Sequence, residues 1–169
     1  IHHMAAKAVT FAEALEFGKD YAAQTIKNAK ALAVELHNLG FKVLGEKKGF
    51  TQSHQAVVNV LDYGDGGKIE ADLEKANIIV NRQLIPGDIK AKRHYMHPGG
   101  IRLGSSEVTR LGMKEPEMQQ IASFIKNIII DKKDGKDIAK QIAEFRKKYQ
   151  KTQYCFDNKL GAYEYVKLR

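Results

Sequence analysis

The sequence predicts an α+β fold: a small, mostly antiparallel sheet of three to four strands, covered by helices on one face and preceded by a long helical segment. Three observations predict it. Apolar residues recur at three- and four-residue steps over residues 20–39, short apolar runs bounded by glycines alternate with further helical patterns, and no parallel βαβ run of any length is present. With 169 residues, the chain is long enough for one sizeable core.

The N-terminal part predicts two helices, over residues 3–16 and 20–39, joined near Gly18. No N-cap residue precedes the strong helix formers, so the sequence is expected to begin inside a helix and to be part of something longer. Gly40 stands where a helix ends in a left-handed conformation.

The remaining elements follow from shorter patterns. Strands are expected over residues 41–44, 56–61, 78–80 and 100–103, and helices over residues 68–76, 116–129 and 134–149. Pro116 suits the first turn of its helix, where a missing N–H costs nothing. We divide the chain into the end of a connecting helix (1–18), a small C-terminal domain (19–150) and a basic, aromatic tail (151–169).

Composition narrows the function classes. The chain is 43% hydrophobic and 28% charged, and its apolar runs are far shorter than the roughly 20 residues that cross a bilayer, so we expect no membrane association. A single cysteine excludes an internal disulfide and is compatible with the cytoplasm. The net charge of +8 raises the question of nucleic acid, but most lysines stand at helical spacing among acidic residues, as on a solvated helix face, so we expect none.

Three motifs carry little chemistry. The run from Gly64 to Lys68 lacks the spacing and the hydroxyl residue of a phosphate-binding loop, and a glycine-rich turn before a helix explains it better. His94 and His97 approach zinc spacing, but no second ligand pair matches them, so no metal site is expected. Cys155 has no neighbouring His and Asp that would make it a nucleophile.

Arg102 is a better candidate. It lies between apolar residues in the segment 99–104, Gly-Gly-Ile-Arg-Leu-Gly, where glycines allow close approach of a ligand. A guanidinium presents a planar fork that matches a carboxylate, and an arginine among apolar residues needs such a partner. From the residues alone, a structural ion pair and a ligand clamp are equally good explanations.

Four segments together resemble the C-terminal part of serine hydroxymethyltransferase, a pyridoxal-phosphate enzyme of the aspartate-aminotransferase fold type. They are His-His-Met-Ala-Ala-Lys-Ala-Val (2–9), Lys-Asn-Ala-Lys-Ala-Leu (27–32), Ala-Asn-Ile-Ile-Val-Asn (76–81) and Gly-Ile-Arg-Leu-Gly (100–104). Each motif is weak alone, but their order and spacing over residues 2 to about 150 are specific. The fold expected is therefore the C-terminal domain of a fold-type I pyridoxal-phosphate enzyme.

The resemblance implies an enzyme that interconverts serine and glycine and transfers the one-carbon unit to a reduced pterin. In that family the arginine of the Gly-Ile-Arg motif holds the substrate carboxylate, and Arg102 matches it. The lysine that carries pyridoxal phosphate lies in a His-Lys-Thr segment upstream of this sequence. We therefore expect no catalytic residue in this chain, and no activity from the chain by itself.

Two differences from the family's sequence pattern bear on which pterin is the carrier. Where the family typically has Val-Asn-Lys-Asn, this chain has Val-Asn-Arg-Gln, so that Gln83 replaces the asparagine that contacts the pterin. The loop over residues 92–98 also differs, and it is longer than usual. Either tetrahydrofolate or tetrahydromethanopterin could be the carrier. The resemblance further implies that the intact enzyme is a homodimer. The cytoplasm is the location expected from the single cysteine.

One alternative of another class stays open at this stage. The alternative is a stand-alone binding or regulatory module that reuses the small domain, for example one that docks on nucleic acid. Such a module should cover the apolar face of its first helix, whereas an enzyme portion should leave Ala5, Val9 and Ala12 exposed.

Overall fold

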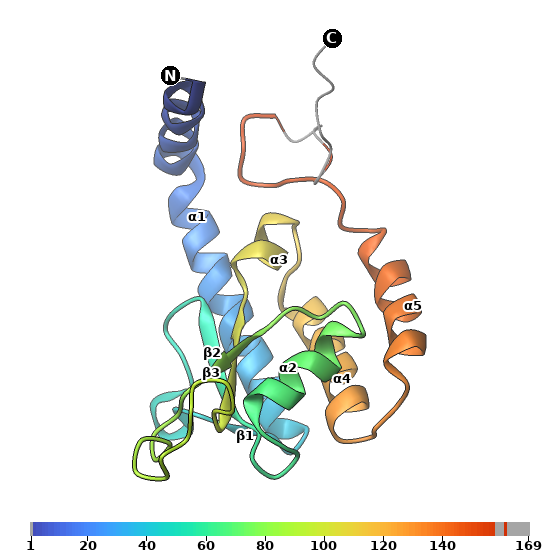
Figure 1. The fold of residues 1–169 in the computed structure, drawn as a ribbon. Coiled ribbons are helices and arrows are strands. Elements are labelled where there is room, and N and C mark those ends of the chain that lie inside the picture. The colour runs from blue at the N-terminus through green and yellow to red at the C-terminus, as the bar shows by residue number, and fades with distance from the viewer. Residues whose placement is uncertain (1, 158–160, 162–169) are drawn as a thin grey trace.

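The computed structural model describes residues 2–157 and 161. Its elements follow in the order α1 (His2–Asn38), β1 (Lys42–Val43), a 3₁₀ turn η1 (Glu46–Lys48), β2 (Gln55–Asn59), α2 (Gly66–Glu74), β3 (Asn81–Gln83), β4 (Gly100–Gly104), α3 (Ser106–Arg110), α4 (Glu115–Ile129) and α5 (Gly135–Arg146). Figure 1 shows the N-terminal half of α1 standing clear of the layered body.

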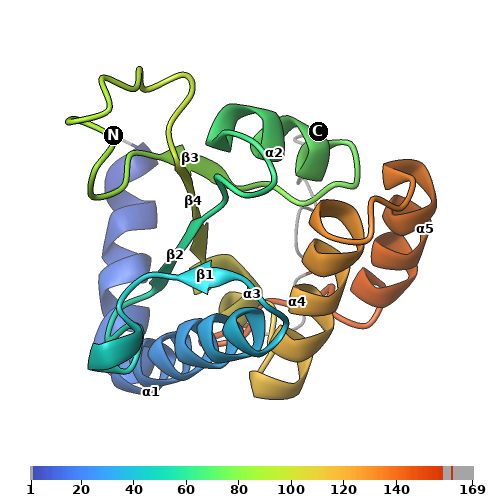
Figure 2. The same ribbon diagram turned by 90° about the horizontal axis from the view of Figure 1, so that it is seen from below.

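The four strands form one antiparallel sheet in the order β1-β2-β4-β3. Helices α2 and α4 and the C-terminal half of α1 cover one face of it, as Figure 2 shows from below. Along the strands, side chains alternate between this covered face and the open face. Val58 and Ile101, paired across β2 and β4, are 1% exposed and belong to the core. The expected α+β fold, with a small antiparallel sheet covered on one face, is confirmed.

The first helix differs from the expectation. The two helices expected on either side of Gly18 are one continuous 37-residue helix. A glycine inside a helix costs only about 1 kcal/mol relative to alanine, which strong helix formers on both sides outweigh. Figure 2 shows the helix axis changing direction between the two halves. The domain boundary proposed at residue 18 thus falls within a single element.

The two halves of α1 differ in burial. Leu32, Ala33 and Leu36 are at most 3% exposed and join the core. In the N-terminal half, by contrast, Phe11 is 67% and Leu15 89% exposed. Ala5, Val9 and Ala12 are exposed as well, as expected for an enzyme portion. The described residues therefore leave these apolar side chains uncovered.

The third expected strand, over residues 78–80, is wrong. Asn77 has a left-handed φ of 61°, and the backbone N–H of Ile78 bonds to the carbonyl oxygen of Leu73, so these residues end α2. Ile79 is 77% exposed. The chain needs these residues to cross from the helix to the sheet, and the strand begins only at Asn81. The short helices η1 and α3 were not expected.

The other boundaries agree to within a few residues. Gly40 has a φ of 96° and ends α1 as expected, and Pro116 lies in the first turn of α4. The apolar residues of α4 are buried, apart from the exposed Pro116 and the half-buried Ile121. Helix α5 packs on α4 through Ile138 and Ile142, which are buried. The buried core residues that α1 contributes, Leu32, Ala33 and Leu36, all lie in its C-terminal half.

The tail folds back in its described part. Tyr154 and Phe156 lie against α1, where the rings of Phe17 and Phe156 are 5.5 Å apart and those of Tyr21 and Tyr154 are 5.3 Å apart. Of the basic, aromatic tail expected over residues 151–169, residues 158–160 and 162–169 lie outside the described part of the chain, and Gly161 forms a bridge with Lys151.

Candidate functional site

Arg102 lies in the middle of β4, an interior strand of the sheet. Its neighbours Ile101 and Leu103 point into the core, so alternation along the strand turns Arg102 toward the opposite, open face. Val57 on β2 and Asn81 on β3 stand beside it in register. Because both adjacent strands hold its backbone, the position of Arg102 is well determined.

The Arg102 side chain is half-buried, and among the described residues it has one hydrogen-bond partner, at a long distance. Its Nη2 donates to the Asn81 Oδ1 at 3.4 Å. Within the part of the chain that the structure describes, no carboxylate forms an ion pair with it. Other arginines do have such partners, as Arg93 has in Asp88 and Arg110 in Glu13. The guanidinium fork on the open face is thus available to an anion, which favours the ligand clamp over the structural ion pair.

Gln83 lies on the same face as Arg102. It is the last residue of the edge strand β3 and pairs with Gly100, while Arg102 pairs with Asn81, so the two side chains are diagonal neighbours. The Gln83 Nε2 donates to the carbonyl oxygen of Leu84 at 3.0 Å. The structure therefore brings together the two site residues that the sequence proposed.

Two neighbours of the site were not identified from the sequence. Asn81 could have been found, because it stands two residues before Gln83 and a strand places such residues on one face. Asp88 gave no signal beyond a Pro-Gly-Asp turn. It is only 2% exposed, and its carboxylate accepts hydrogen bonds from the backbone of Ile85 and Gly99 at the base of the loop between β3 and β4.

The glycine-rich turn is structural. Asp65 caps α2 by accepting a hydrogen bond from the Lys68 backbone N–H at 3.0 Å, and this bond is the main cause that lowers the pKa of Asp65. A Cβ on Gly66 would overlap the carbonyl oxygen of Gly100. The glycines therefore let the start of α2 approach the sheet, and the phosphate-loop alternative finds no support.

The histidine pair does not converge on one point. The His97 Nδ1 lies 3.3 Å from the Asp65 Oδ2, whereas the His94 Nδ1 accepts a hydrogen bond from the backbone of Met96. Within residues 2–157 and 161, no group of three or more His, Cys, Asp or Glu side chains is placed to hold a metal ion. Cys155 is a free, half-buried thiol next to Thr152.

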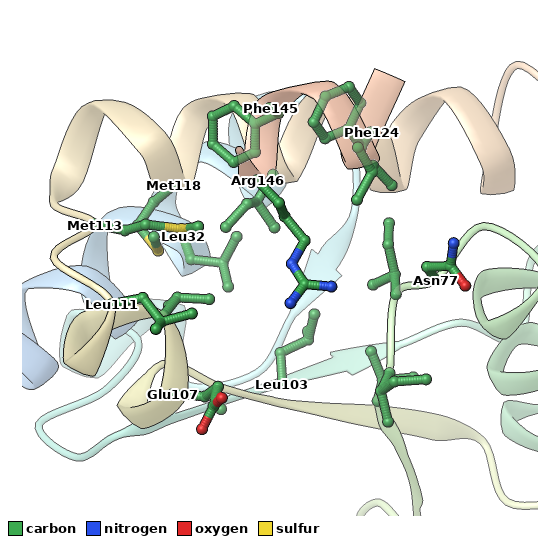
Figure 3. Close-up of a pocket in the computed structure, with 17 residues that line it drawn as sticks. Leu32, Asn77, Leu103, Glu107, Leu111, Met113, Met118, Phe124, Phe145 and Arg146 are labelled. Atoms are coloured by element: carbon green, nitrogen blue, oxygen red, sulfur yellow. The ribbon is translucent and has the colours of Figure 1, made fainter. Parts of the chain in front are cut away.

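A cavity of about 280 Å³ lies on the other side of the sheet, between β4, α3, α4 and α5. Its walls are mostly apolar, and Figure 3 shows the Arg146 side chain reaching into it from α5. Leu103 lines this cavity, and since Leu103 and Arg102 are adjacent on a strand, the cavity and the candidate site are on opposite faces. The cavity is therefore separate from the open-face site.

The described lysines are nearly all exposed. The exception, Lys126, is half-buried and pairs with Asp131 at 2.8 Å. Several lysines form ion pairs along their own helix, such as Lys68 with Asp72 and Lys140 with Asp137. None of the described helices combines the length and the apolar composition needed to span a membrane.

An arginine that an interior strand holds on the open face of a helix-backed sheet is suited to bind an anionic ligand. Comparisons with known proteins specify the family. The family model for serine hydroxymethyltransferase matches residues 1–125. The chain belongs to the serine hydroxymethyltransferase family.

Individual relatives agree over the whole chain. The chain is 75% identical to the serine hydroxymethyltransferase of Nitrosopumilus maritimus and 70% identical to that of Cenarchaeum symbiosum, in each case over 100% of this chain and 38% of the relative. It therefore spans about two fifths of the length of these curated relatives. Among solved structures, the crystal structure of L-threonine transaldolase from Pseudomonas fluorescens in the internal aldimine state is similar, with a TM-score of 0.78 and 39% identity over 90% of this chain and 34% of that chain.

Proposed function

We propose that this chain is the small C-terminal domain of a serine hydroxymethyltransferase, which interconverts serine and glycine and transfers the one-carbon unit to a reduced pterin. The observation that carries the proposal is Arg102, which strands hold on both sides and which has no carboxylate partner among the described residues on the open sheet face. Two findings support it. The chain belongs to the family, and over its full length it is 75% identical to a curated serine hydroxymethyltransferase.

Arg102 binds the carboxylate of serine or glycine in this proposal. Two parallel N–H donors fix both the position and the plane of a carboxylate, so the amino acid is held in one orientation. Asn81 accepts from one guanidinium nitrogen and limits the rotation of the fork. Orientation of this kind lowers the barrier because the bond to be broken is already aligned when the substrate binds.

Pyridoxal phosphate, when bound, supplies an electron sink for bond breaking at the α-carbon of the amino acid. The described residues of this chain do not fit as its attachment site, because their lysines are exposed or, for Lys126, ion-paired. They fit the substrate carboxylate instead. In line with the family resemblance, we propose that none of the described lysines carries the cofactor and that the 169 residues alone do not turn over serine.

Gln83 faces the pterin in this proposal. Its amide lies on the same face as Arg102, one strand further toward the sheet edge, where a second substrate can reach it. A glutamine in place of the family's usual asparagine carries the same donor and acceptor one methylene further out. We propose that this residue adapts the site to its carrier, either tetrahydrofolate or tetrahydromethanopterin. Gln83→Asn should shift the relative kcat/KM for the two carriers, and an unchanged ratio would contradict the assignment.

The conservative substitution Arg102→Lys in the intact enzyme tests the main assignment. It keeps the charge and loses the fork, which is worth about 2–3 kcal/mol, so kcat/KM for serine should fall roughly 30- to 150-fold. The cofactor content of the purified enzyme, measured by absorbance, should not change. Arg146→Lys, on the opposite face, is the matched control. Equal kinetics for the two variants would refute the role of Arg102.

The resemblance to the family supports a homodimer as the intact form, and the single cysteine is compatible with a cytoplasmic location. Sedimentation of the intact enzyme tests the oligomeric state directly: the proposal requires a species of twice the protomer mass. A monomer with full activity would contradict it.

A further inference from the structure

The loop between β3 and β4, residues 84–99, is closed at its base by one buried carboxylate. The Asp88 Oδ2 accepts from the backbone N–H of Ile85 at 3.0 Å and from that of Gly99 at 2.7 Å. The Asp88 Oδ1 lies 3.5 Å from the Arg93 Nε. A single side chain therefore joins the first residues of the loop, its middle and its last residue.

The burial of this carboxylate is nearly complete. Asp88 is 2% exposed, and a charge out of water must be compensated by hydrogen bonds or a partner charge. Two backbone donors and one guanidinium provide that compensation. The loop base is tightly packed, because a Cβ on Gly99 would lie 2.7 Å from the Asp88 Oδ1 and a Cβ on Gly100 would overlap Ile85. The loop base is thus a closed unit built around Asp88.

The two site residues depend on this unit to different degrees. Arg102 lies on β4, which is paired with β2 over five residues, so its backbone is held without the loop. Gln83 lies on β3, an edge strand with three register pairs, all to β4. The chain enters the loop directly after Gln83. Loosening the loop base should therefore displace Gln83 and leave Arg102 in place.

We propose that Asp88 is a positioning residue for the second substrate. It holds the loop base so that Gln83 and the open face keep a fixed geometry toward the reduced pterin. The inference rests on the proposed function, and it assigns to Asp88 an effect on pterin binding that is separable from serine binding.

The kinetic test uses Asp88→Asn in the intact enzyme, because this change keeps the shape and removes the charge. We expect KM for the pterin, measured with whichever of tetrahydrofolate and tetrahydromethanopterin the wild type uses better, to rise about tenfold. KM for serine should stay within twofold. Asp137→Asn, which removes an exposed carboxylate paired with Lys140, should change neither value. A variant in which both KM values rise equally, or neither does, overturns the proposal.

Arg93→Ala is the milder second variant, in case Asp88→Asn fails to fold. It removes the guanidinium and keeps both backbone hydrogen bonds, so the pterin KM should rise by a smaller factor with serine again unaffected. If the pterin KM of a folded Arg93→Ala enzyme equals that of the wild type when Asp88→Asn cannot be purified, the proposal fails.

Hydrogen exchange in the 169-residue chain separates this inference from the proposed function. Asp88→Asn should speed exchange of the Ile85 and Gly99 amides and leave the Arg102 amide protected. Unchanged exchange at Ile85 and Gly99 would show that Asp88 does not close the loop base, whatever the activity of the intact enzyme. A wild-type enzyme that does not act on serine would overturn the proposed function, and with it the kinetic part of the inference, while the exchange result would still decide the role of Asp88 in the loop.

Discussion

The side-chain amide of Asn28 donates a hydrogen bond of 2.8 Å to the hydroxyl of Thr109, joining α1 to α3 across 81 residues of chain. Both side chains are fully buried. The same amide nitrogen donates to the carbonyl oxygen of Met113 at 2.8 Å, and the Asn28 Oδ1 accepts from Gln24. This polar contact inside the core holds α3, which follows directly after the strand of Arg102, against the first helix.

Asn28→Ala should lower the free energy of unfolding by about 2–4 kcal/mol, because it leaves the Met113 carbonyl and the Thr109 hydroxyl without their donor in a dry site. Urea unfolding of the 169-residue chain measures the loss. Gln119→Ala, an exposed amide on α4, is the control and should cost under about 0.5 kcal/mol. A double-mutant cycle with Thr109→Val should show coupling, and strict additivity would mean that the contact contributes nothing.

Glu13→Ala should release the end of the tail from α1. One Glu13 oxygen accepts from the Arg110 Nη2 at 3.0 Å and the other from the Phe156 backbone N–H at 3.1 Å. Without them, the Phe156 amide should exchange faster by NMR. The Gln153 amide, which bonds to the Arg110 carbonyl oxygen at 2.7 Å, should keep its protection. Glu16→Ala, one turn further along the exposed part of the helix, serves as control; similar exchange in both variants would show that Glu13 does not hold the tail.

Gly66→Ala should destabilise the fold by about 1–3 kcal/mol through overpacking. The added methyl group would overlap the carbonyl oxygen of Gly100 and lie 3.0 Å from the Pro98 ring, and the strand backbone cannot move aside as a flexible side chain could. Gly104→Ala is the matched comparison on β4, since a Cβ there has nothing within 4 Å. Thermal unfolding of both variants gives the answer, and equal midpoints would count against the close approach of α2 to the sheet.

Tyr149 should make stability fall at alkaline pH. Burial, reinforced by a hydrogen bond to Glu117, raises the pKa of its hydroxyl from the ordinary 10.0 to about 12. The folded state therefore binds the phenolic proton more tightly than the unfolded state. That contribution is fully present below pH 10 and is lost as the pH rises toward 12. Burial also raises the pKa of Tyr154, which adds in the same direction.

Urea unfolding at several pH values between 9 and 12 tests this prediction. The wild-type chain should lose free energy of unfolding over this interval, and Tyr149→Phe should lose less. Tyr95→Phe, which alters a hydroxyl on a 62% exposed side chain, is the control and should follow the wild type. Parallel curves for the wild type and Tyr149→Phe would contradict the assigned pKa.

Several elements could be predicted because their signals are local. The glycine at residue 40, the proline at residue 116 and the apolar periodicity of α4 and α5 each specify backbone conformation within one or two turns. The strand prediction over residues 78–80 was wrong because the position of a strand depends on distant segments. A β-branched apolar triplet has the composition of a strand, yet the end of α2 and the distance to the sheet place the strand after it.

For the site, the sequence by itself determined the residue types and the family: an arginine among glycines and apolar residues, and four motifs in order. Only the tertiary structure decided whether Arg102 had a carboxylate partner, because partners of an arginine come from segments that sequence does not place in space. Pairing of β3 with β4 put Gln83 and Arg102 on one face, and the buried Asp88 carboxylate closed the loop between them. Such relationships depend on strand register and burial, which arise only when distant segments pack together.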